Sequence, residues 1–246
     1  MSLRDELLRH QLLLMRMIKT QAKDTKALLT KASNLAIKAK KDGKIRGVES
    51  RIKDVLNGIP AIAAEGIQSL AKYENEYSSK KLTKYLPTAV DSINKLFLTD
   101  TENKVMVSTG LNTPPRTLNS LYKGFAAAKT KQYMQIIRDS EVQKLDNEEF
   151  ESIIEERTDG MFSFQNLALA GLAIVGTANT IRNEISNSND LQVDWVLDLE
   201  LNNCSYCEDM ANSGPYNPED VDGEIPAHAN CGCTLIPLLP DADFED

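Results

Sequence analysis

The four cysteines of this 246-residue chain all lie within 30 residues, between Cys204 and Cys233, and no other position holds one. The chain begins Met-Ser-Leu-Arg-Asp-Glu, with acidic residues where a secretory signal has a basic stretch followed by an apolar one. We therefore expect synthesis into a cytoplasm, where thiols stay reduced. In that setting, clustered cysteines favour metal binding over disulfides.

Five candidate ligands occur in three short motifs. Cys204 and Cys207 form a C-x2-C turn, which can direct two sulfurs at one ion. His228 and Cys231 form a similar pair, and Cys233 follows after one residue, so an extended segment would place the last two sulfurs on one side of the chain. A structural zinc site takes four ligands. The expected set is Cys204, Cys207, His228 and Cys231, with an all-cysteine set as the alternative; the fifth residue would pack beside the site.

The loop between the motifs also favours a metal. Residues 213–226 are rich in turn-forming residues and poor in apolar ones, so they bury too little surface to order themselves. Structural zinc in small modules contributes roughly 10–16 kcal/mol of apparent binding free energy. Two disulfides, or buried thiols with no shared role, are the alternatives.

A structural role for the ion is favoured over a catalytic one. A catalytic zinc usually keeps one position open for water and has a carboxylate or a second histidine as proton shuttle. His10 and His228 are the only histidines, and the candidate ligands suffice to close the coordination shell. We therefore expect a structural Zn²⁺, no catalytic residues and no enzymatic activity.

Charge is distributed unevenly along the chain, whose formal net charge is −8. Residues 1–53 carry +9, residues 54–189 carry −3, and residues 190–246 carry −14 with no Lys or Arg. Nucleic acid would repel the acidic end, because phosphate contacts require Lys and Arg. DNA contact is therefore expected only through residues 1–53, and a solvated face or pairing with acidic protein is the alternative.

Apolar residues recur at helical spacing through most of the first 190 residues, and they alternate as in a strand over 193–200. The predicted fold is mainly α, an elongated helical body with a small C-terminal α+β zinc-binding module. The predicted domains are an N-terminal helical region with a basic arm (1–112), a central helical region (113–190) and the acidic zinc module (191–246), with a turn-rich linker at 108–115. Helices are expected at residues 3–41, 48–77 with a break near Pro60, 80–86, 88–98, 118–145, 147–157 and 162–185.

The most apolar of these helices, at 162–185, is expected to be a buried core helix. Its uncharged apolar stretch from Leu167 to Ala178 has 12 residues, whereas about 20 are needed to cross a bilayer. We expect no stable membrane span, and transient membrane contact is the alternative.

The order of residues at the C-terminal end resembles that of a known family, the phage head-morphogenesis proteins, which are the Mu-type minor head proteins of tailed bacteriophages. The resemblance covers roughly residues 160–240, and the helix at 177–183 is similar to the Thr/Asn/Arg-bearing helix of that family. The family usually has Pro-Asn before the third cysteine and Arg between the last two, where this chain has Ala229-Asn230 and Gly232. The matching residues are Trp195, Asp198, Cys204, Cys207, Pro226, His228, Cys231, Cys233, Leu235 and Pro237.

The resemblance implies a non-enzymatic minor head protein of the virion, associated with the portal or the capsid interior and acting in head assembly or in DNA packaging and delivery. The implied partners are the portal and the major capsid protein, in a symmetric assembly of multiple copies. The implied locations are the virion and, during assembly, the host cytoplasm. Two alternatives remain: a zinc-dependent hydrolase, nuclease or toxin that carries a phage-head-like module, and a DNA-binding or membrane-active ejection protein.

Overall fold

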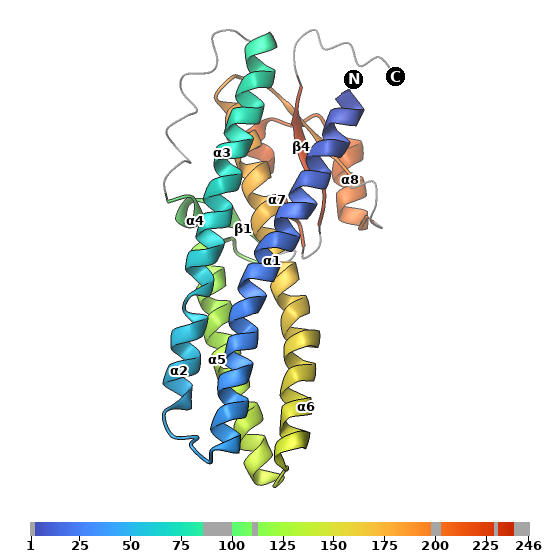
Figure 1. Cartoon of the computed structure of the whole chain (residues 1–246). Coiled ribbons are helices and arrows are strands. Elements are labelled where there is room, and N and C mark those ends of the chain that lie inside the picture. The colour runs from blue at the N-terminus through green and yellow to red at the C-terminus, as the bar shows by residue number, and fades with distance from the viewer. Residues whose placement is uncertain (1–2, 86–99, 110–112, 198–202, 229–230, 239–246) are drawn as a thin grey trace. The chain divides into compact units, whose positions relative to one another are not determined.

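Figure 1 shows the computed structural model of the chain, which describes residues 3–85, 100–109, 113–197, 203–228 and 231–238. Helices dominate and the strands are short, so the predicted mainly α class is confirmed. The helices are α1 (Leu3–Lys41), α2 (Val48–Leu56), α3 (Ile59–Tyr85), α4 (Thr101–Lys104), α5 (Leu118–Val142), α6 (Asn147–Arg157), α7 (Ser163–Asn187) and α8 (Ser205–Ser213). The strands are β1 (Met106–Val107), β2 (Arg116–Thr117), β3 (Val193–Val196) and β4 (Thr234–Pro237).

Helix α1 is the long amphipathic helix that the periodicity predicts, and Gly43 stops it. Gly43 has a φ of 64°, a left-handed conformation that costs glycine little because it has no Cβ. The backbone N–H of Lys44 then donates to the carbonyl of Ala39 at 2.8 Å, which satisfies one of the last carbonyls of the helix. The apolar face of α1 is buried, with Leu29 and Ala36 fully enclosed.

The predicted break near Pro60 is confirmed, because α2 ends at Leu56 and α3 begins at Ile59. Proline is tolerated in the first turn of a helix, where its missing N–H has no intrahelical partner. The predicted end at residue 77 and the separate helix at 80–86 are wrong, since α3 continues to Tyr85. Two serines are too weak a signal to end a helix whose neighbours favour it. The helix expected at 88–98 lies outside the described residues.

Helix α5 ends at Val142, three residues before its predicted end, and Lys144 takes a left-handed φ of 57°. The predicted helix at 147–157 is confirmed as α6. A capping box fixes its start: Asp146 accepts the N–H of Glu149 at 2.9 Å, and the Glu149 carboxylate accepts the N–H of Asp146 at 3.0 Å. A π-helical turn at Thr158–Phe162 precedes α7.

The chain forms two compact units, each built from segments that are distant in sequence. The first unit comprises residues 1–17, 66–118 and 171–246, and the second comprises residues 18–65 and 119–170. The three domains expected from the sequence are each one continuous segment. They concern which segments fold independently, and their boundaries stay a prediction.

Buried polar contacts hold the helices of the second unit in register. The hydroxyl of Thr25 on α1 donates to Oδ1 of Asn166 on α7 at 2.7 Å, and Nδ2 of Asn166 donates to the carbonyl of Ala22 at 2.7 Å. The hydroxyl of Tyr133 on α5 donates to the carbonyl of Leu29 at 2.9 Å. Because a buried polar group left without a partner is costly, these bonds select one alignment of the three helices.

Two short antiparallel pairs accompany the helices of the first unit, β1 with β2 and β3 with β4. The predicted strand is confirmed over β3, and the rest of it, at 198–200, lies outside the described residues. Trp195 of β3 is paired with Leu235 of β4, and both side chains are buried. Helix α7 approaches β1 so closely that a Cβ added at Gly176 would overlap Cγ1 of Val107.

Candidate metal centre

The C-x2-C motif lies at the N-terminus of α8, so the expected turn is the first turn of a helix that the sequence did not predict. Cys204 is the N-cap residue, with an extended backbone, and its Sγ accepts the backbone N–H of Cys207 at 3.4 Å. This bond takes the place of the hydrogen bond that a side-chain oxygen usually makes at an N-cap. It keeps the two sulfurs close together. Cys207 is buried, whereas Cys204 is partly exposed.

The other three candidates lie between the loop and β4. The N–H of Cys231 donates to the carbonyl of His228 at 3.1 Å, which closes the H-x2-C pair into a turn. Cys233 immediately precedes β4, so the pairing of β4 with β3 fixes where this candidate lies. Cys231 and Cys233 are buried and His228 is half-buried.

The structure brings all five candidates into one cluster. The ligand atoms of Cys204, Cys207 and His228 lie within 4.8 Å of one another, and so do those of Cys207, Cys231 and Cys233. Cys207 belongs to both groups and is the centre of the cluster. All four cysteines are free thiols. The cluster can therefore hold a metal ion.

One sulfur–sulfur distance within the cluster matches the value expected for two ligands of a tetrahedral ion. The Sγ atoms of Cys207 and Cys231 are 3.9 Å apart. Two sulfurs that bind one zinc at about 2.3 Å in tetrahedral geometry are about 3.8 Å apart. Thiolate sulfur and imidazole nitrogen are also the donors that zinc prefers in closed sites.

Burial and crowding raise the pKa values of two thiols. Burial raises the pKa of Cys207 to about 12, and charge on Cys231 contributes to the rise. The hydrogen bond with Cys233, together with burial, raises the pKa of Cys231. At Cys204 burial acts in the same direction, but hydrogen bonds from the backbone and side chain of Cys207 outweigh it and lower the pKa. A bound cation would favour the thiolate form of all these groups.

The carboxylate nearest in sequence to the second ligand motif is engaged elsewhere. Tyr206 donates to Oε2 of Glu224 at 2.7 Å, and the ring of Tyr206 meets that of Trp195 edge to face, with centroids 6.1 Å apart. Glu224 belongs to neither ligand group. Among the described residues, the metal-ligating groups that gather around Cys207 are therefore thiols and one imidazole.

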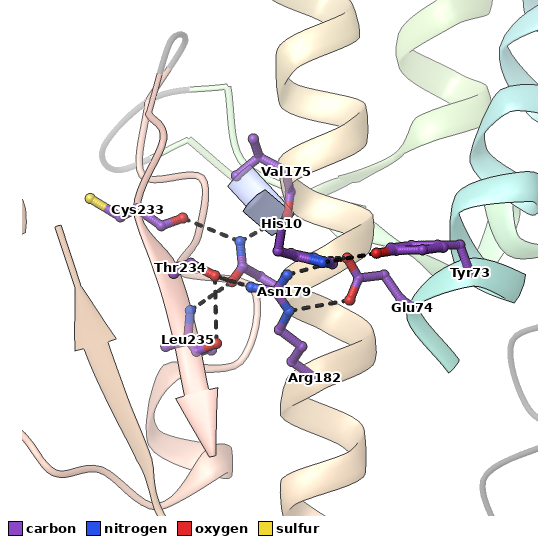
Figure 2. A network of polar contacts seen from close by, with 9 residues as sticks. All are labelled: His10, Tyr73, Glu74, Val175, Asn179, Arg182, Cys233, Thr234 and Leu235. Atoms are coloured by element: carbon purple, nitrogen blue, oxygen red, sulfur yellow. Dashed lines mark hydrogen bonds and ion pairs between the residues drawn. The ribbon is translucent and has the colours of Figure 1, made fainter. Parts of the chain in front are cut away.

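A polar network that sequence reasoning missed connects the cluster to α7 (Figure 2). Oδ1 of Asn179 accepts the N–H of Leu235 at 2.7 Å and the hydroxyl of Thr234 at 3.2 Å, and its Nδ2 donates to the carbonyl of Cys233 at 3.3 Å. Arg182, almost one turn further along α7, donates from Nη1 to the hydroxyl of Thr234. Asn179 thus binds the backbone on both sides of Thr234, directly after the last candidate ligand, Cys233.

The network continues through a buried group of charged residues on three helices (Figure 2). Arg182 donates to both carboxylate oxygens of Glu74, from Nε at 3.3 Å and from Nη2 at 3.2 Å. Nε2 of His10 lies 2.6 Å from Oε1 of the same carboxylate, whose side chain is fully buried. His10 and Glu74 are 64 positions apart. No local pattern joins them, and only the Asn/Arg-bearing helix could be anticipated, from the family resemblance.

Some basic residues of the N-terminal region are neutralised within the second unit, and others face solvent. Lys19, Lys23, Lys31 and Lys38 are exposed on α1. The exposed lysines agree with DNA contact and also with a solvated face, so both interpretations of the basic region stay predictions. The ion pairs join Lys26 to Asp159, Lys40 to Glu141 and Lys41 to Glu151.

One helical stretch of the described residues is long and apolar enough to cross a membrane. It is Asn147–Asn187, with a window of mean hydropathy 1.4, of which 61% is buried inside the protein. A buried core helix passes the same test of length and composition. The expectation of no stable membrane span stays a prediction.

The sequence matches no family model, and comparisons with curated proteins and with solved structures found no match. The resemblance to the phage head-morphogenesis family therefore depends on the C-terminal residues alone.

Proposed function

We propose that the C-terminal region is a structural zinc module that serves as a docking element of a non-enzymatic phage minor head protein. The zinc assignment is carried by one observation: two groups of three ligand atoms converge on the sulfur of Cys207. No carboxylate belongs to either group, and five donors are available for four positions. With four thiol or imidazole ligands the zinc has a closed coordination shell, and no position is left for a substrate or a reactive water.

Metal analysis of the purified full chain tests the zinc assignment. We expect one zinc per chain by elemental analysis and protection of the liganding thiols from alkylation until a chelator is added. Absence of zinc from protein purified without chelator, and failure to take up added Zn²⁺, would contradict the assignment.

The ligand set can be resolved with Co²⁺, whose absorption spectrum distinguishes a four-sulfur site from a site with three sulfurs and one nitrogen. Cys204, Cys207, His228 and Cys231 form the preferred set, so His228→Asn should change the Co²⁺ spectrum and Cys233→Ser should not. The reverse outcome would favour the all-cysteine set.

The role in the phage head is supported by the resemblance of the C-terminal residues and by the charge of the module. Every exposed charged side chain among the described residues of 190–246 is acidic, because this region contains no Lys or Arg. Such a surface suits docking on a basic face of the portal or the major capsid protein. Mass spectrometry of proheads and mature virions should detect the chain, and its absence from both would contradict the role.

A DNA-binding role of residues 1–53 is the second candidate, favoured by the exposed lysines of α1. We expect the full chain to bind duplex DNA with a salt-dependent affinity, and the variant carrying Lys19→Ala, Lys23→Ala and Lys31→Ala to bind more weakly. Lys72→Ala, an exposed lysine on α3, is the matched control. No binding at about 50 mM salt would remove this candidate.

A further inference from the structure

Residues 233–235 begin two positions after the expected ligand Cys231 and include the alternative ligand Cys233, and side chains of α7 hold them in place. Asn179 makes three hydrogen bonds to residues 233–235 and a fourth, from Nδ2, to the carbonyl of Val175 at 2.9 Å in its own helix. It therefore acts as a rigid support for the backbone beside Cys233. Residues that hold metal ligands in place in this way commonly change metal affinity when they are replaced.

Arg182 extends this support away from the cluster. Its guanidinium lies between the hydroxyl of Thr234 and the carboxylate of Glu74, and its side chain is almost completely buried. A buried guanidinium and carboxylate must stay paired, because an unpaired charge in that environment is strongly unfavourable. A shift of Thr234 would therefore be transmitted to Glu74.

His10 completes the path on α1. Its ring stacks on Tyr77 with centroids 4.6 Å apart and on Tyr73 at 5.6 Å, and its Nε2 contacts the carboxylate of Glu74. His10 is 3% exposed and is the polar anchor of the N-terminal part of α1 on α3. The contacts from Cys233 to His10 form one continuous chain of buried groups within the first unit (Figure 2).

We propose that Asn179 and Arg182 are positioning residues for the metal cluster, and that through Glu74 and His10 the occupancy of the cluster controls how firmly the N-terminal part of α1 is docked. The proposal rests on the proposed function only in requiring that the cluster bind a metal. Its consequence is a protein whose N-terminal segment is released when the C-terminal ion is lost. Because coupling between two sites is reciprocal, loosening the segment must also weaken metal binding.

The first experiment compares amide hydrogen exchange of the full chain with and without one equivalent of Zn²⁺. We expect the amides of residues 9–17 to exchange about tenfold more slowly with the metal bound, alongside those of residues 231–237. Protection confined to residues 203–237 would leave the zinc assignment intact and overturn the coupling. If the chain binds no Zn²⁺, the zinc assignment and the coupling fail together.

The second experiment measures the affinity for Co²⁺ by competition. His10→Phe keeps the stacking on Tyr73 and Tyr77 but loses the contacts of the His10 ring nitrogens with the Tyr73 hydroxyl and with Glu74, which Arg182 still neutralises. Arg182→Lys keeps the charge but not the planar set of donors. Both should weaken Co²⁺ binding about tenfold without changing the Co²⁺ spectrum, because the ligands are intact.

The matched control is Arg16→Gln, an exposed residue on the same segment of α1. It should leave the Co²⁺ affinity unchanged. Equal affinities of the wild type, His10→Phe and Arg182→Lys would overturn the proposal, and so would a changed spectrum in His10→Phe. Should either variant fail to fold, the exchange experiment on the wild-type chain decides the question by itself.

Discussion

Arg182 on α7 binds Glu74 on α3 through two donors of its guanidinium, with the carboxylate fully buried. A pair of this kind is strongly destabilising to break from one side, because the remaining charge stays buried without a partner. The fold of the first unit therefore depends on residues that are 108 positions apart.

Replacing Glu74 with Gln should lower the free energy of unfolding by about 3–5 kcal/mol, because Arg182 loses its buried counter-charge. Chemical denaturation followed by circular dichroism measures the change. Glu76→Gln, an exposed neighbour on the same helix, is the control and should change stability by less than about 0.5 kcal/mol. A loss in Glu74→Gln no larger than in the control would contradict the importance of the pair.

The same carboxylate should make stability depend on acid. Burial raises the pKa of Glu74, but Arg182 and His10 outweigh it, so the pKa lies below the ordinary value of 4.5. The stabilisation is therefore complete above about pH 4.5 and is lost as the pH falls through the lowered pKa of the folded state. The melting temperature of the wild type should fall more steeply below pH 4.5 than that of Glu74→Gln, and parallel curves would contradict this.

Replacing Gly176 with Ala should destabilise the first unit by about 1–3 kcal/mol, because the new methyl group overlaps Cγ1 of Val107. Gly171→Ala is the control on the same helix, where an added Cβ meets nothing within 4 Å. The control should be neutral or more stable by up to about 1 kcal/mol. The double variant Gly176→Ala with Val107→Ala should recover part of the loss, and a loss unchanged by Val107→Ala would show that the overlap is not its cause.

Removing the metal should loosen the C-terminal module and spare the helices of the second unit. We expect chelator, or Cys231→Ser, to open residues 195–240 to limited proteolysis while the core around Tyr133 and Phe150 stays protected. Ser205→Ala, beside Cys204, is the control and should behave as the wild type. Unfolding of the whole chain, or no new cleavage, would contradict the idea that the C-terminal module loosens without the helices of the second unit.

Lys129 should give stability an alkaline dependence. Burial lowers the pKa of its amine to about 8 from an ordinary 10.5, although it lies over the Phe162 ring at 4.3 Å. The unfolded chain then binds more protons between pH 8 and 10.5, so the free energy of unfolding should rise with pH in that interval. Lys129→Met should flatten the rise, whereas the exposed Lys131→Met should retain it. Equal slopes in all three proteins would contradict the lowered pKa.

The sequence predicted what depends on local patterns. Helices α1 and α6 are confirmed nearly to their ends, because helical periodicity is a local signal, and the structure adds the local stop at Gly43 and the Asp146 capping box. The five candidate ligands are brought together as their spacing indicates. Helix α8 was missed because its nine residues offer too few turns for a periodic pattern and because the cap is a cysteine.

What the sequence could not predict are contacts between distant segments. Nothing near His10 or Glu74 marks them as partners, since a lone histidine and one glutamate among many have no characteristic spacing. The need for glycine at 176 likewise depends on where β1 passes over α7, which only the folded chain defines. The grouping of the chain into two discontinuous units has the same origin.

One residue, Thr234, separates Cys233 from Leu235, and this spacing restricts which insertions and deletions the protein can tolerate. Side chains alternate along a strand, so inserting or deleting one amino acid after Cys233 would turn Leu235 outward and bring its neighbour against Trp195. The same change of strand register would break the hydrogen bonds between Asn179 and the backbone of Cys233 and Leu235. Length changes should therefore be tolerated at exposed positions of the segment 214–224, between α8 and the second ligand motif, but not in the three positions that follow Cys233.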